Sequence, residues 1–249
     1  HLNCYNSNMM KLPAQPNRSL IDGVSVLQEL ASRGCATSCN ELSEALHIEK
    51  TKVNRILKTL AYLGMVSTTP SRKYQPGEGM HILAAQSIYG SGLLNAALKH
   101  LSALRECGHT VALGVLWRDR VSYLYHCSPG KDVIEGPGRH GAYPLGQSSP
   151  GMAVAAGKSD EELHQCFPDG QVAGFDGAFD EFLEEMRRTR ERGYACIKDS
   201  PEHITMAVSI GNPAFAAIAL AGNIKDDELD DLALLLKAKA GAIEHELAI

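Results

Sequence analysis

Cationic and amide side chains gather on one short stretch of the chain, residues 51–64. Four apolar residues of this stretch repeat at i, i+3, i+4 and i+7, the spacing of a buried stripe on an α-helix: Val53, Ile56, Leu57 and Leu60. The polar residues between them must then face away from the core: Lys52, Asn54, Arg55 and Lys58. Lysine and arginine attract phosphate groups, and an asparagine amide can make two hydrogen bonds to a base such as adenine. The stretch therefore favours contact with a nucleic acid, although the same pattern also fits the solvated face of an ordinary core helix.

The charge of the chain is divided unevenly along its length. The 249 residues carry 24 Lys and Arg against 29 Asp and Glu, a net charge of −5. Residues 1–76 contain nine basic and five acidic residues, a net of +4, which leaves fifteen basic and twenty-four acidic residues after them, a net of −9. A basic head followed by an acidic body suggests that the first part binds nucleic acid and the second does something else.

Two further helices are expected before the cationic one. The first is predicted over residues 20–33 and is ended by Gly34. Ser38 and Glu41 have the spacing of a capping box, which predicts the start of a second, short helix. The cationic stretch is then the third helix, and Gly64 ends it because glycine tolerates a positive φ.

A hairpin is expected directly after the third helix. Residues 65–68 and 73–75 alternate like two short strands, with Arg72 and Lys73 near the tip between them. Three helices followed by a hairpin with a basic tip predict a winged helix-turn-helix, whose third helix enters the DNA major groove. The expected DNA contacts are Thr51, Lys52, Asn54, Arg55, Lys58, Arg72 and Lys73.

The rest of the chain is predicted to form an α+β domain. Helices are expected over residues 79–107, with a break at 90–92, and near 150–156, 160–167, 179–193 and 229–247. Strand pairs are expected at 111–116 with 121–127 and at 205–210 with 215–221. Because helices separate the strand pairs, we expect one antiparallel sheet flanked by helices and no parallel βαβ repeats. The expected domains are a flexible tail (1–18), a winged helix-turn-helix (19–76), a linker helix (77–92) and a C-terminal domain (93–249).

Several motifs follow one another in order from about residue 19 to the C-terminus. They include CNELSEALHIEKTKVNRILKTLAYLGMV with RKYQPG after it, VALGVLWRDRVSYLYHC, LGQSSPGMAVAA and the RERGYA of residues 190–195. This ordered combination resembles the IclR family of transcriptional regulators. The resemblance implies a GAF-like C-terminal domain that binds a small organic effector, and homodimers or pairs of dimers on double-stranded operator DNA. We therefore expect a ligand-responsive repressor, without catalytic activity.

The resemblance also places the effector against a glycine-containing loop and the central strands. The loop residues are Gly146, Gln147, Ser148, Ser149 and Gly151, where backbone N–H groups would suit a carboxylate. The strand residues are Tyr125, Ile197, Thr205, Ala219 and Ala221.

The chain departs from the family pattern at this site. Ala219 and Ala221 stand where regulators of very small acids can use serine hydroxyls, and Ile197 and Lys198 stand where many relatives have an acidic residue. We therefore expect a less polar pocket that admits a larger or aromatic acid. The alternative is that the alanines merely pack the sheet.

The main alternative function is a cysteine-dependent redox enzyme or redox sensor built on a GAF-like domain. Three cysteines fall in the C-terminal part, Cys127, Cys166 and Cys196, but the seven cysteines of the chain show no CxxC and no metal-ligand spacing. His126 and Cys127 cannot act together on a flat strand because successive side chains point to opposite faces. The chain also has no GxSxG, HExxH, Walker loop or GxGxxG opening a helix. We expect no catalytic site, metal or cofactor.

Composition argues for an ordinary cytoplasmic protein. The hydrophobic content of 44% is sufficient for a core, and the longest apolar runs are far shorter than the roughly 18 residues that a membrane-spanning helix requires. The first residues lack the pattern of a secretory signal.

Overall fold

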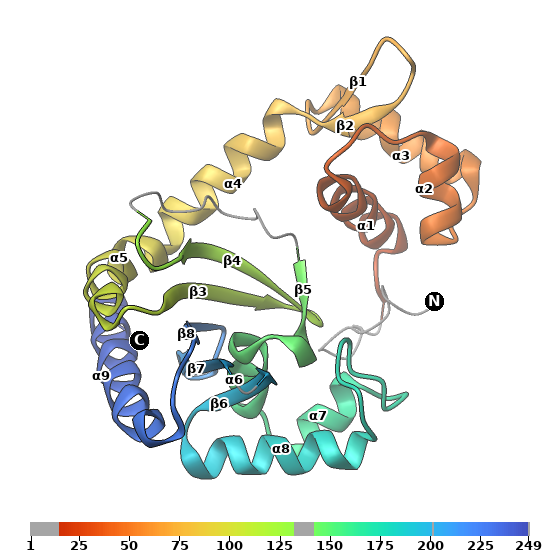
Figure 1. Cartoon of the computed structure of the whole chain (residues 1–249). Helices are drawn as coiled ribbons and strands as arrows, with labels where there is room; N and C mark the ends of the chain where they lie inside the picture. Colours follow the sequence, from red (N-terminus) through yellow and green to blue (C-terminus); the bar gives the residue numbers. More distant parts are fainter. Residues whose placement is uncertain (1–14, 132–141, 201, 249) are drawn as a thin grey trace. The chain divides into compact units, whose positions relative to one another are not determined.

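The computed structural model describes residues 15–131, 142–200 and 202–248 (Figure 1). These residues fall into two compact units, with the boundary between Ser91 and Gly92. The first fourteen residues of the expected tail lie outside the described residues, and Arg18 already belongs to the first helix.

The first unit contains the three expected helices, the expected hairpin and the helix expected after it. Its elements are α1 (Arg18–Arg33), α2 (Cys39–Leu46), α3 (Lys50–Tyr62), β1 (Val66–Thr68), β2 (Tyr74–Pro76) and α4 (Glu78–Ser91). Buried side chains from α1, α2, α3 and β1 form the small core: Val26, Leu30, Leu42, Val53, Leu57 and Val66. The predicted winged helix-turn-helix is confirmed as the fold of this unit.

Local signals in the sequence set the ends of these helices. The Asn17 side chain accepts a hydrogen bond from Leu20 N at the start of α1, and Gly34 ends α1 with a φ of 64°. Ser38 and Glu41 form both hydrogen bonds of the expected capping box, at 3.2 Å and 2.7 Å. Gly64 follows α3 with a φ of 70°, as its position predicted.

The second unit contains a six-stranded sheet with helices on both faces. Its helices are α5 (Leu93–Leu104), α6 (Ser149–Ala156), α7 (Asp160–Cys166), α8 (Phe179–Arg192) and α9 (Leu229–Leu247), with short 3-10 turns η1 (Arg105–Cys107), η2 (Leu145–Gln147) and η3 (Asp226–Glu228). Its strands are β3 (Thr110–Trp117), β4 (Arg120–Cys127), β5 (Ala142–Pro144), β6 (Ala195–Ser200), β7 (His203–Ile210) and β8 (Ala216–Gly222). The strand order is β5-β4-β3-β8-β7-β6, and every pairing is antiparallel.

The two faces of this sheet have different side chains and different cover. Large apolar residues such as Leu113, Met206 and Ile218 face α5 and α9, which pack together (Figure 1). Small residues such as Ala112, Ala207 and Ala219 face the side covered by α6, α7 and α8. All eight residues of α6 are buried, so the alanines give this helix room to lie close to the sheet.

The sequence did not predict two of the strands. β5 has only three residues, and β6 is an edge strand whose last residues are exposed and polar. Neither strand is long enough in apolar residues to show the alternating pattern that predicts a strand. The break in the helix after Ser91 is confirmed, and Gly92 has a φ of 68° there. No helix within the described residues is long and apolar enough to cross a membrane.

Candidate nucleic-acid interface and effector cavity

The cationic helix α3 has one buried face and one exposed face. Val53 and Leu57 are completely buried in the core of the first unit, as their spacing predicted. Three of the expected DNA contacts lie exposed on the other side: Thr51, Arg55 and Lys58. Their spacing of four and three residues aligns them on one side of the helix, where they can face a nucleic acid together.

Two expected contacts on α3 are less available. Asn54 is only partly exposed. The Lys52 ammonium forms an ion pair with the carboxylate of Asp22 in α1, and its side chain is 40% exposed. Its charge is therefore partly compensated within the protein, whereas none of the ion pairs among the described residues involves Arg55.

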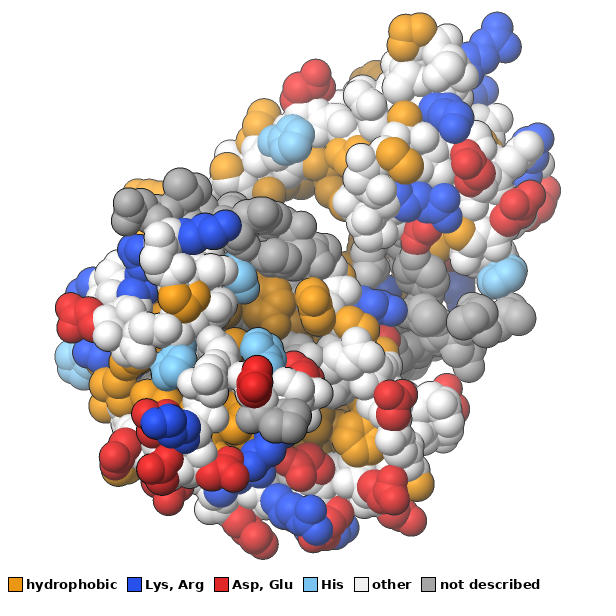
Figure 2. All heavy atoms as spheres, in the orientation of Figure 1, with side chains coloured by type: hydrophobic (Ala, Val, Ile, Leu, Met, Phe, Trp, Pro, Cys, Tyr) orange, Lys and Arg blue, Asp and Glu red, His pale blue; other side chains and the backbone are white. Residues whose placement is uncertain are grey.

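The hairpin presents the two expected basic residues at its tip. The Thr69 hydroxyl accepts a hydrogen bond from Lys73 N at 3.1 Å and also contacts Ser71 Oγ at 2.9 Å, which ties the turn together. Arg72 has a φ of 59° and is exposed, while Lys73 is half-buried. In the orientation of Figure 1, Figure 2 shows Lys and Arg side chains at the tip of this hairpin.

One residue of α3 extends the exposed face beyond the expected set. Tyr62 lies seven residues after Arg55, on the same side, and is 90% exposed. The i, i+7 spacing from Arg55 would have found Tyr62, but an aromatic residue is usually assigned to a core.

A cavity of about 260 Å³ lies on the alanine-rich face of the sheet in the second unit. Its lining combines small strand residues with hydroxyl, amide, imidazole and carboxylate groups: Thr110, Ala112, Tyr123, His126, Tyr143, Gln147, Ser148, Ser149, Pro150, Asp199, His203, Thr205, Ala219, Leu220 and Ala221. Six of the expected effector residues are among them: Gln147, Ser148, Ser149, Thr205, Ala219 and Ala221.

Tyr125 does not line this cavity, and a β-bulge in β4 brings Tyr123 to it instead. Leu113 of β3 pairs with Tyr125, but the next residue, Gly114, pairs with Tyr123, so Leu124 is the extra residue. Tyr123 and His126 consequently face the cavity together, while Tyr125 is buried under α5 and α9. Tyr125, which the sequence predicts as an effector residue, therefore lies outside the cavity, and Tyr123, which it does not predict, lines it.

Two glycines of the expected loop, Gly146 and Gly151, serve close packing. A Cβ atom at Gly146 would lie 2.5 Å from Phe175 N, and one at Gly151 would lie 2.8 Å from Leu145 O. Neither residue lines the cavity. Each lets two backbone segments approach more closely than a side chain would permit.

Three backbone N–H groups of this loop already have partners. Gly146 N donates to Ala173 O at 2.9 Å, Ser148 N to Leu145 O at 3.1 Å, and Gly151 N to Ser148 Oγ at 3.3 Å. A carboxylate could therefore use these three N–H groups only by displacing their present partners.

Ile197 and Lys198 lie on β6, outside the cavity lining. Ile197 packs against the apolar cluster beneath α6 and α8. Lys198 Nζ forms an ion pair with Asp226 at 2.6 Å on the surface. The residue that follows them, Asp199, does line the cavity and lies 3.2 Å from Nδ1 of His203.

The polar groups of the cavity are hydroxyls, imidazoles, the Gln147 amide and the Asp199 carboxylate. Neither lysine nor arginine occurs in its lining. Tyr123 OH lies 3.3 Å from Ser148 Oγ, and burial raises the pKa of the Tyr123 phenol although the contact with Ser148 opposes this. The phenol therefore stays protonated at neutral pH and can donate a hydrogen bond to an acceptor such as a carboxylate oxygen.

The cysteines of the second unit show no sign of activation. Cys127 and Cys166 are buried and Cys196 is half-buried. Burial raises the pKa of the Cys166 and Cys196 thiols, which keeps both protonated at neutral pH. The thiolate is the reactive form, so this environment works against redox or nucleophilic chemistry. Among the described residues no group of three His, Cys, Asp or Glu side chains could hold a metal ion.

No protein-family model matches the sequence, and no curated protein resembles it closely enough to be matched. Solved structures do match nearly the whole chain. An IclR transcriptional regulator from Alicyclobacillus acidocaldarius is 22% identical, with 93% of this chain and 99% of that one covered and a TM-score of 0.73. An IclR family transcriptional regulator from Brucella abortus is 17% identical over 99% and 98% of the two chains, with a TM-score of 0.75.

A third similar structure contains a ligand. It is an IclR homolog from Microbacterium hydrocarbonoxydans complexed with 4-hydroxybenzoate, 18% identical over 92% of this chain and 99% of that one, with a TM-score of 0.66. These likenesses show that the chain has the α+β fold of IclR-type transcriptional regulators, with a helix-turn-helix unit before a sheet unit.

Proposed function

We propose that this protein is a sequence-specific DNA-binding transcriptional regulator of the IclR type, that it acts as a repressor, and that it has no catalytic activity. The exposed cationic face of α3 is the observation that carries the proposal. It combines Thr51, Arg55 and Lys58 on one side of the third helix of a winged helix-turn-helix. In this fold that helix lies in the major groove, where such side chains reach phosphates and base edges.

The remaining expected contacts take supporting roles in this proposal. Asn54 reads a base edge from the side of α3, and Arg72 and Lys73 contact the DNA backbone from the hairpin. Lys52 must divide its charge between Asp22 and the nearest phosphate. Tyr62 extends the same face at the C-terminal end of α3.

We further propose that the protein functions as a homodimer, alone or as a dimer of dimers. α4 exposes Ile82, Leu83 and Tyr89, and none of its residues is buried. Apolar surface of this kind is normally covered by a partner. A two-fold dimer would present two α3 helices to the two halves of an inverted repeat.

The cavity in the second unit is the proposed effector site, and a small aromatic acid is the proposed effector class. The small side chains of Ala112, Ala219 and Ala221 leave space over the sheet for a flat ring. Tyr123, Ser148 and Thr205 offer hydroxyls to its polar groups. The 4-hydroxybenzoate bound to a protein of the same fold supports this class of ligand. The effector can change DNA affinity only if it binds one arrangement of the two DNA-reading units more tightly than the other.

Fluorescence anisotropy tests the proposed function. The purified protein is titrated onto DNA from the intergenic region upstream of its own gene and onto a scrambled duplex, over a series of salt concentrations. We expect preference for its own DNA and an affinity that falls steeply as salt rises. Equal affinity for both duplexes, or no binding with or without aromatic acids, would contradict the proposal.

Calorimetry separates the proposed effector class from its alternative. We expect 4-hydroxybenzoate or a related aromatic acid to bind, and glyoxylate and pyruvate to bind weakly, because these small acids leave much of the 260 Å³ cavity empty. Tight binding of glyoxylate or pyruvate, with no binding of any aromatic acid, would show that the alanines only pack the sheet.

A further inference from the structure

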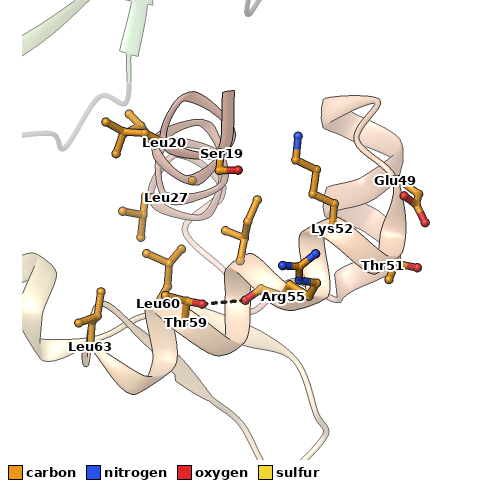
Figure 3. A pocket seen from close by; sticks show the side chains of 13 residues that line it. Ser19, Leu20, Leu27, Glu49, Thr51, Lys52, Arg55, Thr59, Leu60 and Leu63 are labelled. Atoms are coloured by element: carbon orange, nitrogen blue, oxygen red, sulfur yellow. Dashed lines mark hydrogen bonds between the residues drawn. The ribbon is translucent and has the colours of Figure 1, made fainter. Parts of the chain in front are cut away.

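A second cavity, of about 540 Å³, lies within the first unit as a groove between α1 and α3 (Figure 3). Both helices contribute to its walls: Ser19, Leu20, Gly23, Val24 and Leu27 from α1, and Thr51, Lys52, Arg55, Ile56, Thr59, Leu60 and Leu63 from α3 and its end, with Glu49 before it. It is larger than the proposed effector cavity and belongs to a different unit.

The groove has an apolar end and a cationic end. Figure 3 shows Leu20, Leu27, Leu60 and Leu63 on the side of the groove near the C-terminal end of α3. Lys52 and Arg55 stand at the other end, near the start of α3. The groove thus has the two-part character of a site for an amphipathic molecule.

Gly23 keeps the groove open. It occupies the interior of α1, where glycine is unfavourable compared with alanine. A Cβ atom at this position would meet nothing within 4 Å. A larger residue would therefore enter open space and fill the groove without disturbing the helix.

At the cationic end Arg55 is the side chain that can bind an anion, beside the Lys52–Asp22 ion pair and Glu49. The Lys52 ammonium is paired with Asp22, but Arg55 is exposed and none of the ion pairs among the described residues includes it. Figure 3 places the Glu49 carboxylate beyond Lys52, farther from the leucines than Arg55. A carboxylate seated beside Arg55 could accept two hydrogen bonds from its guanidinium while an attached chain or ring covers the leucines.

The geometry points to a binding site for an amphipathic organic anion, such as a medium-chain or aromatic carboxylate, in the groove between α1 and α3. Because Arg55 also belongs to the exposed DNA-facing side of α3, the bound anion and a DNA phosphate compete for the same guanidinium. The ligand would lower DNA affinity directly, independently of the cavity in the second unit. This effect on DNA rests on the proposed function, whereas binding in the groove does not.

Calorimetry with octanoate and 1-octanol tests the binding itself on the full chain. We expect octanoate to bind and octanol, which has the same chain without the charge, to bind about tenfold more weakly or worse. Arg55→Gln should weaken octanoate to about the level of octanol, because it removes the charged partner while leaving an exposed, foldable position. Equal affinity of the two probes for the native protein would overturn the proposal.

Two glycine substitutions test where octanoate binds. Gly23→Leu should abolish octanoate binding because its side chain fills the groove. Gly241→Leu is the matched control: Gly241 also lies inside a helix, α9, with nothing within 4 Å of its Cβ position, and this variant should bind octanoate like the native protein. Octanoate binding that persists in Gly23→Leu would show that the groove is not this site. The same conclusion would follow if the native protein bound no octanoate and Gly23→Leu dissociated an oligomer.

Competition with DNA is measured last. This order lets the proposed function and the proposed competition be tested independently. Octanoate should raise the apparent dissociation constant for operator DNA in the native protein and in Gly241→Leu. Gly23→Leu should bind DNA and be insensitive to octanoate. Octanoate binding without any DNA binding would refute the proposed function alone, while DNA binding that octanoate never affects would refute the competition.

Discussion

Arg55 and Lys52 are three residues apart on the same helix, yet their surroundings give them different roles. Arg55 is exposed, whereas Lys52 is paired with Asp22 of the neighbouring helix. An exposed, uncompensated guanidinium can approach a phosphate or a guanine edge at little cost. Lys52 must give up part of an existing ion pair to do the same.

Replacement of Arg55 should therefore affect DNA binding and not stability. We expect Arg55→Ala to weaken operator binding by roughly 1–3 kcal/mol and to reduce the salt dependence, with an unchanged melting temperature. Anisotropy titrations and thermal denaturation check this. Arg188→Ala is the control, because Arg188 is also exposed on a helix, but in the second unit. An unchanged affinity in Arg55→Ala would remove Arg55 from the interface.

Tyr123 and Tyr125 are separated by one residue and face opposite sides of the sheet. Only Tyr123 reaches the proposed effector cavity, where its hydroxyl lies 3.3 Å from Ser148 Oγ. The two tyrosines provide a natural pair of variants for testing which face binds the effector.

Loss of the Tyr123 hydroxyl should weaken effector binding. We expect Tyr123→Phe to reduce the affinity for an aromatic acid by about 1 kcal/mol, the contribution of one ordinary hydrogen bond. Tyr125→Phe should leave this affinity unchanged, because its side chain lies under α5 and α9. Calorimetry with 4-hydroxybenzoate compares the two, and a larger effect at Tyr125 would return the site to the other face.

At the scale of elements, α4 is unusual because its apolar residues are uncovered within its own unit. Ile82, Leu83 and Tyr89 are all more than half exposed, and no residue of α4 is buried. The helix follows β2 after one residue and makes its few contacts with β1. Contacts within its own unit bury little of the apolar surface of this helix. Contact with a second copy of the protein is the simplest way to bury it.

A charge placed on α4 should dissociate the proposed homodimer. We expect Leu83→Glu, at a position 53% exposed, to weaken self-association at least about tenfold by placing a carboxylate in an apolar contact. Leu234→Glu is the control, because Leu234 is 65% exposed on α9. Sedimentation measures the oligomer. A native protein that is monomeric at all concentrations would contradict this role of α4.

Two helices begin with the same capping arrangement, one in each unit. Ser38 with Glu41 starts α2, and Ser159 with Glu162 starts α7. Hydrogen bonds from the serine hydroxyl and backbone lower the pKa of the Glu41 carboxyl, and those from the Ser159 backbone and hydroxyl lower that of Glu162. Because both folded pKa values are lowered, these bonds contribute above the ordinary carboxyl pKa and are lost as the pH falls through the lowered values.

At the scale of the whole molecule, each unit has its own apolar core. The core of the first unit is formed by α1, α2, α3 and β1, and the second unit has one core on each face of its sheet. A chain of two units with separate cores can unfold in two steps, so one melting temperature need not describe it.

Heat denaturation should accordingly show two transitions. We expect Ser38→Ala to lower the free energy of unfolding of the first unit by about 1 kcal/mol. Ser159→Ala should lower that of the second unit by a similar amount. Differential scanning calorimetry resolves the two. At acidic pH, where both glutamates are protonated, the effect of each variant should shrink. A single transition that both variants shift equally would mean that the units unfold together.

The sequence by itself determined the order and the ends of the helices, the hairpin after α3, and the α+β class of the second unit. These features depend on neighbours three or four residues apart, on capping pairs such as Ser38 and Glu41, and on glycines such as Gly64. Such interactions are local, so their pattern is written directly in the chain.

The tertiary structure decided which of the candidate residues can act. The pairing of Lys52 with Asp22 joins two helices, and the face of Tyr123 depends on a bulge created by strand pairing. The groove at Gly23 is lined by residues of both α1 and α3. Each of these depends on residues distant in sequence, and a register shift of one residue is enough to reverse which side chains face a site.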